Sequence, residues 1–501
     1  MATYYIDPTG VNDAGRTGLV GQEWATLSYA CTRVTTVGDI IHVNPGTYNE
    51  SSQIVKALGV SIEGEGDTSH IISTYTNASS LQAAIQCAST AGTTIDDNSS
   101  ISYIKLTGSN LTSTRAIFVG YRNNLHIHHC TIEDFLYMGV YFYVSASYPT
   151  VYATGLKLYD CVINNCASYG GGYQGNVRVS GTDGTEIYDC SFDNTFRPTG
   201  YNAHIFSTYR NKRLKIHDNV LIKNNHETTA EGVDTWNFFL EEWNYKGDSE
   251  FYNNTLYGLA KFSLGGDEND IEDGCTFGYK VYNNQWLNDT NGNRLNNGDD
   301  STAYCLTVEG NNHNEVYVYN NLIQRFAWGL EIATPTSSTG GTWSQNWSNQ
   351  NIYFYHNIIT DVGYLDHAYS YGIFIINEPN QDGYTNALSN VHIYNNIITA
   401  LDGVTYDGYQ GIRVTSNGTL TGLNIHNNII QDFSSYAIYL TENTPGLALT
   451  NADITYNCMY NNGTNSVYVN NNIDLTNIDV ATGNITTDPL FVSSTDFHLQ
   501  A

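Results

Sequence analysis

Short runs of apolar and polar residues recur along the chain in two interleaved patterns. The first pattern is an apolar residue, two variable residues, Asn or Cys, one variable residue and a second apolar residue. It recurs about every 33 residues, which is within the range of solenoid repeats. Its copies are IHHCTI from Ile127, LYDCVI from Leu158, IYDCSF from Ile187, IHDNVL from Ile216, FYNNTL from Phe251, VYNNQW from Val281, VYNNLI from Val318, FYHNII from Phe354, IYNNII from Ile393, IHNNII from Ile425 and ITYNCM from Ile454.

The second pattern is an apolar, a variable and an apolar residue, usually after Gly or Ala. Its copies are AIFV at Ile117, GVYF at Val140, NVRV at Val177, HIFS at Ile205, NFFL at Phe238, KFSL at Phe262, CLTV at Leu306, GLEI at Leu330, GIFI at Ile373, GIRV at Ile412 and AIYL at Ile438. Each repeat thus carries at least two strands that are too short to bury a core alone. Stacking coil on coil buries their inward residues and pairs each strand with its next copy, through right-handed connections.

The Asn of the first pattern forms a column at one corner of the predicted coil. At such a corner each side-chain amide can donate to the amide stacked about 4.8 Å away, so that no buried polar group is left unpaired. Cys130, Cys161 and Cys190 occupy the same column in three consecutive coils, where we expect small apolar fillers. The column otherwise contains Asn219, Asn254, Asn284, Asn321, Asn357, Asn396, Asn428 and Asn457.

The repeats, together with both ends of the chain, resemble a known superfamily. The opening segments YYIDPTG, WATLSYAC and GDIIHVNPGTYNE and the closing DPLFVSSTDFHLQ are similar to the right-handed parallel β-helix, pectate-lyase-like superfamily. That resemblance covers nearly the whole chain and implies an all-β solenoid of about 12 coils. The superfamily includes secreted polysaccharide lyases and hydrolases and phage tailspikes, so the resemblance implies the fold and leaves the activity open.

The predicted domain organisation follows from these patterns. Residues 24–34 place Leu27, Ala30 and Cys31 at helical spacing, which predicts a short amphipathic helix that caps the first coil. We expect a cap and first coil over residues 1–58, the β-helix over 59–480, and a tail over 481–501 from which a C-terminal extension has been lost or excluded.

Composition narrows the possible partners. There are 45 Gly, 8 Pro and 40 Tyr, which suits short strands joined by polar turns. The formal charge of −29 opposes binding to nucleic acid or anionic membranes and attracts divalent cations. It also opposes binding of an acidic polysaccharide unless Arg, Lys or a metal lines the site.

No apolar run approaches the length of a membrane span. No signal peptide is visible, and the nine Cys form no CxxC pair. The resemblance implies an extracellular or virion-surface protein that is a monomer or a homotrimer.

Two columns of the second pattern are predicted to lie on the outer face, where a polysaccharide would bind. In one of them Glu241 and Glu309 lie two coils apart across Gly265, about 9 to 10 Å in backbone spacing. Paired carboxylates at roughly 6.5 to 9.5 Å suit an inverting glycosidase, one as acid and one as base. The alternative is that both are solvated surface glutamates. The predicted substrate-binding residues around this pair are Arg178, Phe206, Tyr209, Arg210, Phe239, Glu242, Trp243, Asp267, Glu331, Phe374 and Arg413.

A lyase would need a Brønsted base together with cations or Ca²⁺ that neutralise a uronate. His204, Tyr209 and Arg210 are candidates on one coil, although the Arg-Pro-x-x-Arg, Asn-Thr-Asp, Gly-His-Gly and Arg-Ile-Lys signatures are absent. A Ca²⁺ loop is suggested by Asp289, Asn291, Asn293 and Asp300, whose offsets match positions 1, 3, 5 and 12 of such loops.

Three functions therefore remain open. The first is a glycan-degrading enzyme that works in a mid-solenoid groove, with hydrolysis favoured. The second is a polysaccharide lyase that uses Ca²⁺ or Arg/Tyr chemistry. The third is a tailspike or adhesin that binds a glycan without cleaving it.

Overall fold

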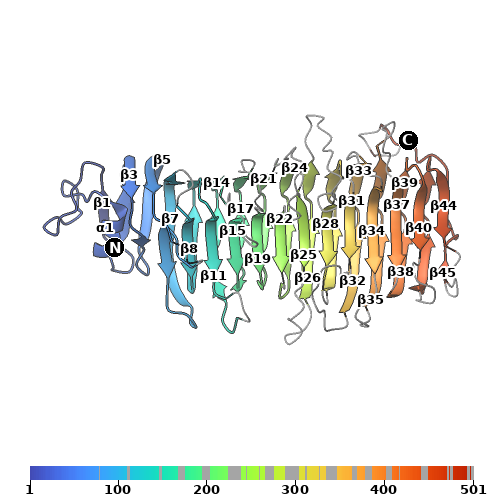
Figure 1. Ribbon diagram of the computed structural model, residues 1–501, viewed down its shortest axis with the longest axis horizontal. Coiled ribbons are helices and arrows are strands. Elements are labelled where there is room, and N and C mark those ends of the chain that lie inside the picture. Colours follow the sequence, from blue (N-terminus) through green and yellow to red (C-terminus); the bar gives the residue numbers. More distant parts are fainter. Residues whose placement is uncertain are drawn as a thin grey trace. The chain divides into compact units, whose positions relative to one another are not determined.

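A computed structural model describes residues 1–77, 79, 81–109, 113–145, 149–166, 175–194, 204–223, 238–243, 245–258, 260–265, 276–287, 304–310, 313–326, 328–333, 347–363, 369–377, 386–401, 409–416, 418–441, 449–470, 473, 478–493 and 497. The chain divides into two compact units, Met1–Tyr245 and Lys246–Ala501. Each unit is a right-handed parallel β-helix, in which each strand pairs in parallel with its counterpart in the next coil (Figure 1). The prediction of an all-β solenoid is confirmed.

In each unit, one strand per coil builds a narrow sheet. In the first unit this narrow sheet contains β4 (Ile54–Val55), β6 (Ile85–Ala88), β8 (Arg115–Gly120), β11 (Met138–Tyr143), β15 (Gly175–Ser180), β19 (His204–Tyr209) and β22 (Phe238–Trp243). In the second unit it contains β25 (Lys261–Gly265), β28 (Tyr304–Glu309), β31 (Trp328–Ala333), β34 (Tyr371–Asn377), β37 (Gln410–Ser416), β40 (Tyr436–Thr441) and β44 (Thr464–Val469).

The other strands of each coil build a wide sheet. In the first unit these are β1 (Thr3–Ile6), β2 (Ile40–Val43), β3 (Gly46–Glu50), β5 (Ser61–Ser73), β7 (Ile95–Gly108), β9 (Arg122–His128), β10 (Thr131–Glu133), β13 (Lys157–Tyr159), β14 (Val162–Asn164), β17 (Glu186–Tyr188), β18 (Ser191–Asp193), β20 (Lys215–His217) and β21 (Val220–Lys223). A separate pair is β12 (Ala153–Thr154) and β16 (Thr182–Asp183).

The wide sheet of the second unit is built in the same way. It contains β23 (Ser249–Tyr252), β24 (Thr255–Gly258), β26 (Thr276–Tyr282), β27 (Gln285–Leu287), β29 (His313–Tyr319), β30 (Leu322–Gln324), β32 (Trp347–Tyr355), β33 (Ile358–Val362), β35 (Asn386–Tyr394), β36 (Ile397–Ala400), β38 (Thr419–His426), β39 (Ile429–Gln431), β41 (Leu449–Thr450), β42 (Ala452–Thr455), β43 (Cys458–Tyr460) and β45 (Ile478–Asp479).

The predicted capping helix is present as α1 (Leu27–Arg33). Thr26 caps its N-terminus, because the Thr26 side chain accepts a hydrogen bond from the backbone N–H of Tyr29. Leu27, Ala30 and Cys31 are its buried residues, and the helix packs against β1 to β4. The apolar interior of the first coil is thereby covered.

The corner column forms the predicted amide ladder. In the second unit the Asn254 amide donates to Asn284 Oδ1 at 3.1 Å and the Asn284 amide to Asn321 Oδ1 at 3.0 Å. The ladder continues through Asn357, Asn396, Asn428 and Asn457 to Asn484. The residue before each ladder position is left-handed, for example Asn283 with φ 57° and Asn320 with φ 55°. Asn tolerates that conformation, which explains the repeated Asn-Asn pairs.

The thiols of the first unit substitute for ladder amides. The Asn219 amide donates to the carbonyl of Ile187, on the preceding coil, at 3.0 Å. Cys190 Sγ donates to the equivalent carbonyl of Leu158 at 3.7 Å, and Cys161 Sγ to that of Ile127 at 3.8 Å. Burial raises the pKa of the Cys161 thiol well above its ordinary value. The cysteines are therefore neutral thiols that fill the corner as small residues, as predicted, and donate weak hydrogen bonds in place of the Asn amides.

Replacing one ladder amide should destabilise the second unit. In Asn357→Leu, the backbone N–H of Asn321, the carbonyl of Val318 and Asn396 Oδ1 each lose a buried partner. We expect a loss of a few kcal/mol of unfolding free energy. Thermal and urea denaturation would measure it, with Asn424→Leu on the outer face of β38 as the control. Equal stability of the two variants would mean that the ladder amides are not needed for stability.

Aromatic side chains form a second ladder on the outer face of the wide sheet. In the second unit the rings of Tyr282, Tyr319 and Tyr355 stack at centroid distances of 4.9 Å with interplanar angles of 4–6°. The stack begins at Tyr252 and continues to Tyr394 and His426. Since the ring faces cover each other, this ladder accounts for five of the 40 Tyr without invoking a ligand.

Candidate functional site

The outer face of the narrow sheet contains a column of side chains set by the strand register. In the first unit the register aligns Tyr141, Arg178, Ser207 and Glu241 on successive strands. In the second unit it aligns Ser263, Thr307, Glu331, Phe374, Arg413 and Tyr439. We call each of these sets the outer column of its unit.

The register corrects the predicted position of Glu241. Glu241 pairs with Ser207 and therefore lies in the outer column of the first unit itself. In the second unit, Glu309 lies two residues beyond Thr307 of the outer column. Phe206 pairs with Val177 and packs its ring 4.8 Å from Phe192, so it faces the core instead of a ligand.

The error has a physical cause. The strands of this sheet begin with two successive buried positions, such as Ala116 and Ile117 or Cys305 and Leu306. Where three apolar residues follow one another, the alternation of apolar and polar residues does not show which of the three begins the regular inward–outward pattern of the strand. Phe239 is likewise fully buried, and Leu240 is the residue that pairs with Phe206.

Glu242 faces the core. Glu242 pairs with Thr208 and is fully buried, and its Oε2 accepts a hydrogen bond from the Thr208 hydroxyl at 2.5 Å. Burial raises the pKa of Glu242 to about 8, although the Thr208 hydrogen bond lowers it in part. The predicted ligand-binding glutamate therefore lies in the core, where burial favours its neutral form.

Replacing Glu242 with Gln should remove a pH dependence of stability. Because the folded-state pKa is raised, the folded state binds the proton more tightly than the unfolded chain, and stability falls as pH rises from about 4.5 to about 8. The wild type should lose about 3 kcal/mol by pH 7, whereas Glu242→Gln should keep this stability. Thermal unfolding between pH 5 and pH 8 would measure it, with Glu250→Gln as the control. A wild type and a variant with parallel pH profiles would contradict a buried, protonated Glu242.

Glu241 forms a buried pair with His204 at the edge of the same face. His204 Nε2 and Glu241 Oε2 are 3.1 Å apart, and the two side chains are only 1% and 2% exposed. The contact lies within ion-pair range but is not aligned as a hydrogen bond, and His204 Nδ1 has no partner among the described residues. Buried polar atoms without partners are uncommon in folded proteins, so each calls for an explanation. This arrangement was only partly predicted, because His204 was considered for a lyase and Glu241 for a hydrolase.

Cations of the first unit lie against aromatic rings near this pair. The Arg178 guanidinium lies 5.1 Å from the centre of the Tyr141 ring, and that of Arg210 lies 4.9 Å from the Tyr209 ring. Arg178 is in the outer column, next to Ser207. Trp243 follows on the strand of Glu241 and pairs with Tyr209. The structure thus places Arg178, Tyr209, Glu241 and Trp243 on one face.

In the second unit two carboxylates lie on adjacent strands of the outer face. Thr307 pairs with Glu331, and Glu309 follows Thr307 by two residues. Strand geometry separates the two glutamate backbones by about 8 Å. Ser263 donates a hydrogen bond to Glu309 Oε1 at 2.9 Å, while the buried hydroxyl of Thr307 has no hydrogen-bond partner within the described part of the chain. Glu309 is half-buried and Glu331 is buried. Glu241 and Glu309 belong to different units, so their predicted pairing stays a prediction.

The aromatic residues of this face are largely buried. Trp328 stacks on Tyr371 with ring centroids 5.8 Å apart, and the Tyr371 and Phe374 centroids are 4.9 Å apart. Phe374 is 8% exposed, and Phe118 and Tyr141 in the first unit are 3% and 2% exposed. At these positions the rings therefore pack on one another and expose little surface.

Several predicted site residues lie outside the described residues. They are Asp267 and the proposed Ca²⁺ ligands Asp289, Asn291, Asn293 and Asp300. Among the described residues, no group of three or more His, Cys, Asp or Glu could hold a metal ion. The Ca²⁺ site stays a prediction. No helix in the described part of the chain is long and apolar enough to cross a membrane.

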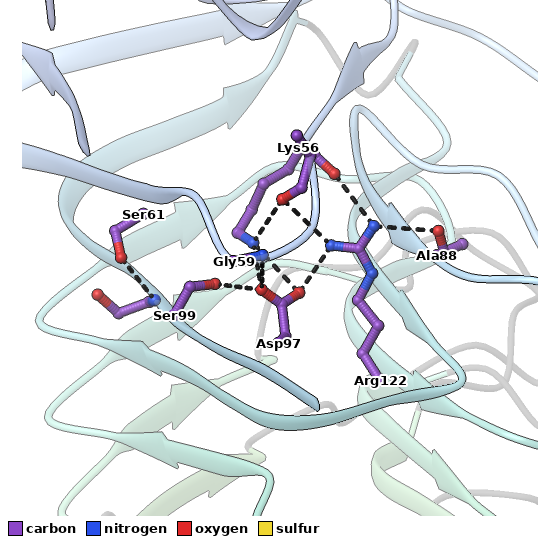
Figure 2. A network of polar contacts seen from close by, with 9 residues as sticks. Lys56, Gly59, Ser61, Ala88, Asp97, Ser99 and Arg122 are labelled. Carbon is purple, nitrogen blue, oxygen red and sulfur yellow. Dashed lines mark hydrogen bonds and ion pairs between the residues drawn. The ribbon is translucent and has the colours of Figure 1, made fainter. Parts of the chain in front are cut away.

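A buried charged network in the first unit was not predicted (Figure 2). Asp97 accepts from Lys56 Nζ at 3.0 Å and from Arg122 Nη1 at 2.6 Å. Arg122 also donates to the carbonyls of Lys56 and Ala88, at 3.2 and 3.1 Å. The network joins the turns of three successive coils, and its carboxylate contacts both of its cations. Arg122 Nε has no hydrogen-bond partner within the described residues. Opposite charges that neutralise one another in this way suit a structural role. In the sequence, the only signal of this network is that Lys56, Asp97 and Arg122 fall at the turns of successive coils. These three residues form no recognisable spacing motif.

No family model and no curated protein matches the chain. Among solved structures, the Dettilon tailspike protein is 12% identical, covers 88% of this chain and 68% of its own, and gives a TM-score of 0.43. An alginate lyase from Paenibacillus sp. is 12% identical, with coverages of 79% and 95% and a TM-score of 0.34. An exopolygalacturonase from Thermotoga maritima is 10% identical, with coverages of 83% and 83% and a TM-score of 0.34.

The chain is a parallel β-helix protein. This conclusion rests on the coil-to-coil strand pairing within each unit. Structural similarity at 10–12% sequence identity and TM-scores of 0.34–0.43 assigns neither an activity nor a substrate to the chain.

Proposed function

We propose that this β-helix protein hydrolyses a glycan on the outer face of the narrow sheet in the second unit, with Glu309 and Glu331 as its acid–base pair. The observation that carries the proposal is the register of β28 and β31, which places these carboxylates about 8 Å apart in backbone spacing on one face. That spacing is compatible with the 6.5–9.5 Å carboxyl separation of inverting glycosidases. We further propose that the protein works outside the cell or on a virion surface, where such glycans occur.

The surroundings of each carboxylate suggest its role. Glu309 reaches solvent and is oriented by the Ser263 hydroxyl, so it is placed to activate a water molecule. Glu331 is 5% exposed and would protonate the leaving glycosidic oxygen. The Thr307 hydroxyl, which has no hydrogen-bond partner within the described residues, lies opposite Glu331 and two residues before Glu309, where it could hold a substrate hydroxyl or the attacking water.

A β-elimination in the first unit is the second candidate, and the buried His204–Glu241 pair favours it. His204 would take the proton next to the uronate carboxylate through Nδ1 while the bond to the glycosidic oxygen breaks and the double bond forms. Glu241 would stabilise the imidazolium, which can return its proton to the departing sugar oxygen. Arg178, on the same face, would neutralise the uronate carboxylate.

One assay separates the candidates. The protein would be incubated with neutral, carboxylated and sulfated polysaccharides while reducing ends and ultraviolet absorbance of unsaturated products are followed together. Hydrolysis releases reducing ends without new absorbance, whereas elimination gives both. Binding without either signal would contradict an enzymatic role and support the adhesin.

A further inference from the structure

Arg413, in the outer column of the second unit, is held in a fixed position by its neighbours. Its guanidinium lies over the rings of Tyr371, Phe374 and Tyr439, at 5.2, 5.7 and 5.7 Å from their centres. Arg413 Nη1 donates to the Tyr371 hydroxyl at 2.6 Å, and Nε donates to the Thr415 hydroxyl at 3.1 Å. Two hydrogen bonds and three rings thus fix a side chain that is ordinarily flexible.

The charge of Arg413 has no acidic partner among the described residues, although the chain has a net charge of −29. Other cations on the surface pair with carboxylates: Lys157 with Glu186 at 2.7 Å, Arg213 with Asp183 at 2.7 Å and Arg325 with Asp361 at 3.5 Å. Arg413 is half-buried, and its Nη2 makes no hydrogen bond within the described residues. It therefore retains donors for a ligand.

The position of Arg413 links it to the proposed carboxylate pair. The strand register aligns it with Phe374 and, one strand further, with Glu331. Two strand spacings correspond to about 10 Å. A glycan chain that lies along the column with a glycosidic bond at Glu331 would therefore place a neighbouring sugar unit over Arg413.

We propose that Arg413 recognises an anionic substituent, a carboxylate or a sulfate ester, on a sugar near the cleavage point. This inference rests on the proposed function for its location, and it adds the chemical class of the substrate. A guanidinium binds planar or tetrahedral oxyanions through several N–H donors. On a strongly acidic protein, a fixed cation also offsets locally the repulsion that an acidic glycan would otherwise meet.

Binding and turnover of Arg413→Gln test the proposal. The probes are polygalacturonate, a sulfated galactan, and their carboxyl-reduced and desulfated forms. For the anionic probe that the wild type binds, Arg413→Gln should weaken binding or raise KM by roughly 10- to 100-fold with kcat changed little, because a charge-assisted hydrogen bond is lost. Arg413→Lys should keep part of the affinity. The carboxylated and sulfated arms identify which substituent is recognised.

The control variant is Arg325→Gln, which removes an ion-paired surface arginine of the same unit and should leave KM and binding unchanged. Equal losses for the anionic and the neutralised probes, or no loss for any of them, would overturn the proposal. Affinity electrophoresis measures binding without catalysis. If activity does not require Glu309 and Glu331 but anion binding still requires Arg413, the proposed hydrolytic function is contradicted and the proposed anion-binding role of Arg413 is supported.

Discussion

Glu309→Gln and Glu331→Gln should each lower turnover of the glycan substrate by about 10²–10⁴-fold, the usual contribution of general acid–base assistance. Each substitution keeps the shape of the side chain and removes its ability to exchange a proton. In Glu309→Gln the Ser263 hydroxyl can still donate to the amide oxygen of the new side chain, so folding and glycan binding should be nearly unchanged. Initial rates of reducing-end release would measure the effect, and melting temperatures would confirm the fold.

The matched control is Glu315→Gln, which changes an exposed glutamate on β29 of the same unit. It should keep wild-type turnover. If both Glu309→Gln and Glu331→Gln lose less than about tenfold, the two glutamates are surface residues without a catalytic role. Loss of activity in Glu241→Gln or in a His204 variant alone, with formation of unsaturated products, would move the active site to the first unit.

Asp97→Asn should destabilise the first coils by about 3–5 kcal/mol, because it leaves Lys56 and Arg122 buried without a counter-ion. Burial alone would raise the pKa of Asp97, but Lys56, the Ser99 hydrogen bond and Arg122 outweigh it, so the pKa lies below its ordinary value. The stabilisation from this carboxylate is therefore present above the unfolded-state pKa and is lost as pH falls through the folded-state pKa.

Hydrogen exchange of amides in β4, β6 and β8 would locate the effect of Asp97→Asn, since a chain of two units need not unfold in one step. Asp96→Asn is the control, because Asp96 precedes Asp97 and is exposed. Protection that is equal in the two variants would show that the network is dispensable.

The coil repeat was predictable because it depends on local chemistry that recurs. The sequence itself shows the repeated Asn pairs and the apolar residues that flank them. In the structure these pairs form the left-handed turns and the amide column. The helix over residues 27–33 was predictable for the same reason, because its apolar spacing is helical. Such features need only a few neighbouring residues to be recognised.

The candidate site was harder to predict because a shift of one residue reverses the face of a strand. That shift placed Phe206 on the wrong face. In NFFLEEW the run of three apolar residues hides the inward position, so Glu241 was assigned to a column two residues away on the same face, and Glu242 was taken for a ligand-binding residue although it faces the core. The Glu309–Glu331 pair depends on which strands adjoin, and that follows from the coil boundaries as well as from each strand. The aromatic contacts that fix Arg413 likewise join residues from three coils.

The amide ladder also bears on how such a chain can change its length in evolution. Each ladder Asn donates towards the following coil, accepts from the preceding one, and donates to a carbonyl of that preceding coil. Every junction in the ladder therefore has the same donors and acceptors. Duplicating or deleting one whole coil would rejoin equivalent groups and leave no amide unmatched, whereas losing half a coil would interrupt the series. The coil, rather than the single residue, is the natural unit by which this protein can grow or shrink.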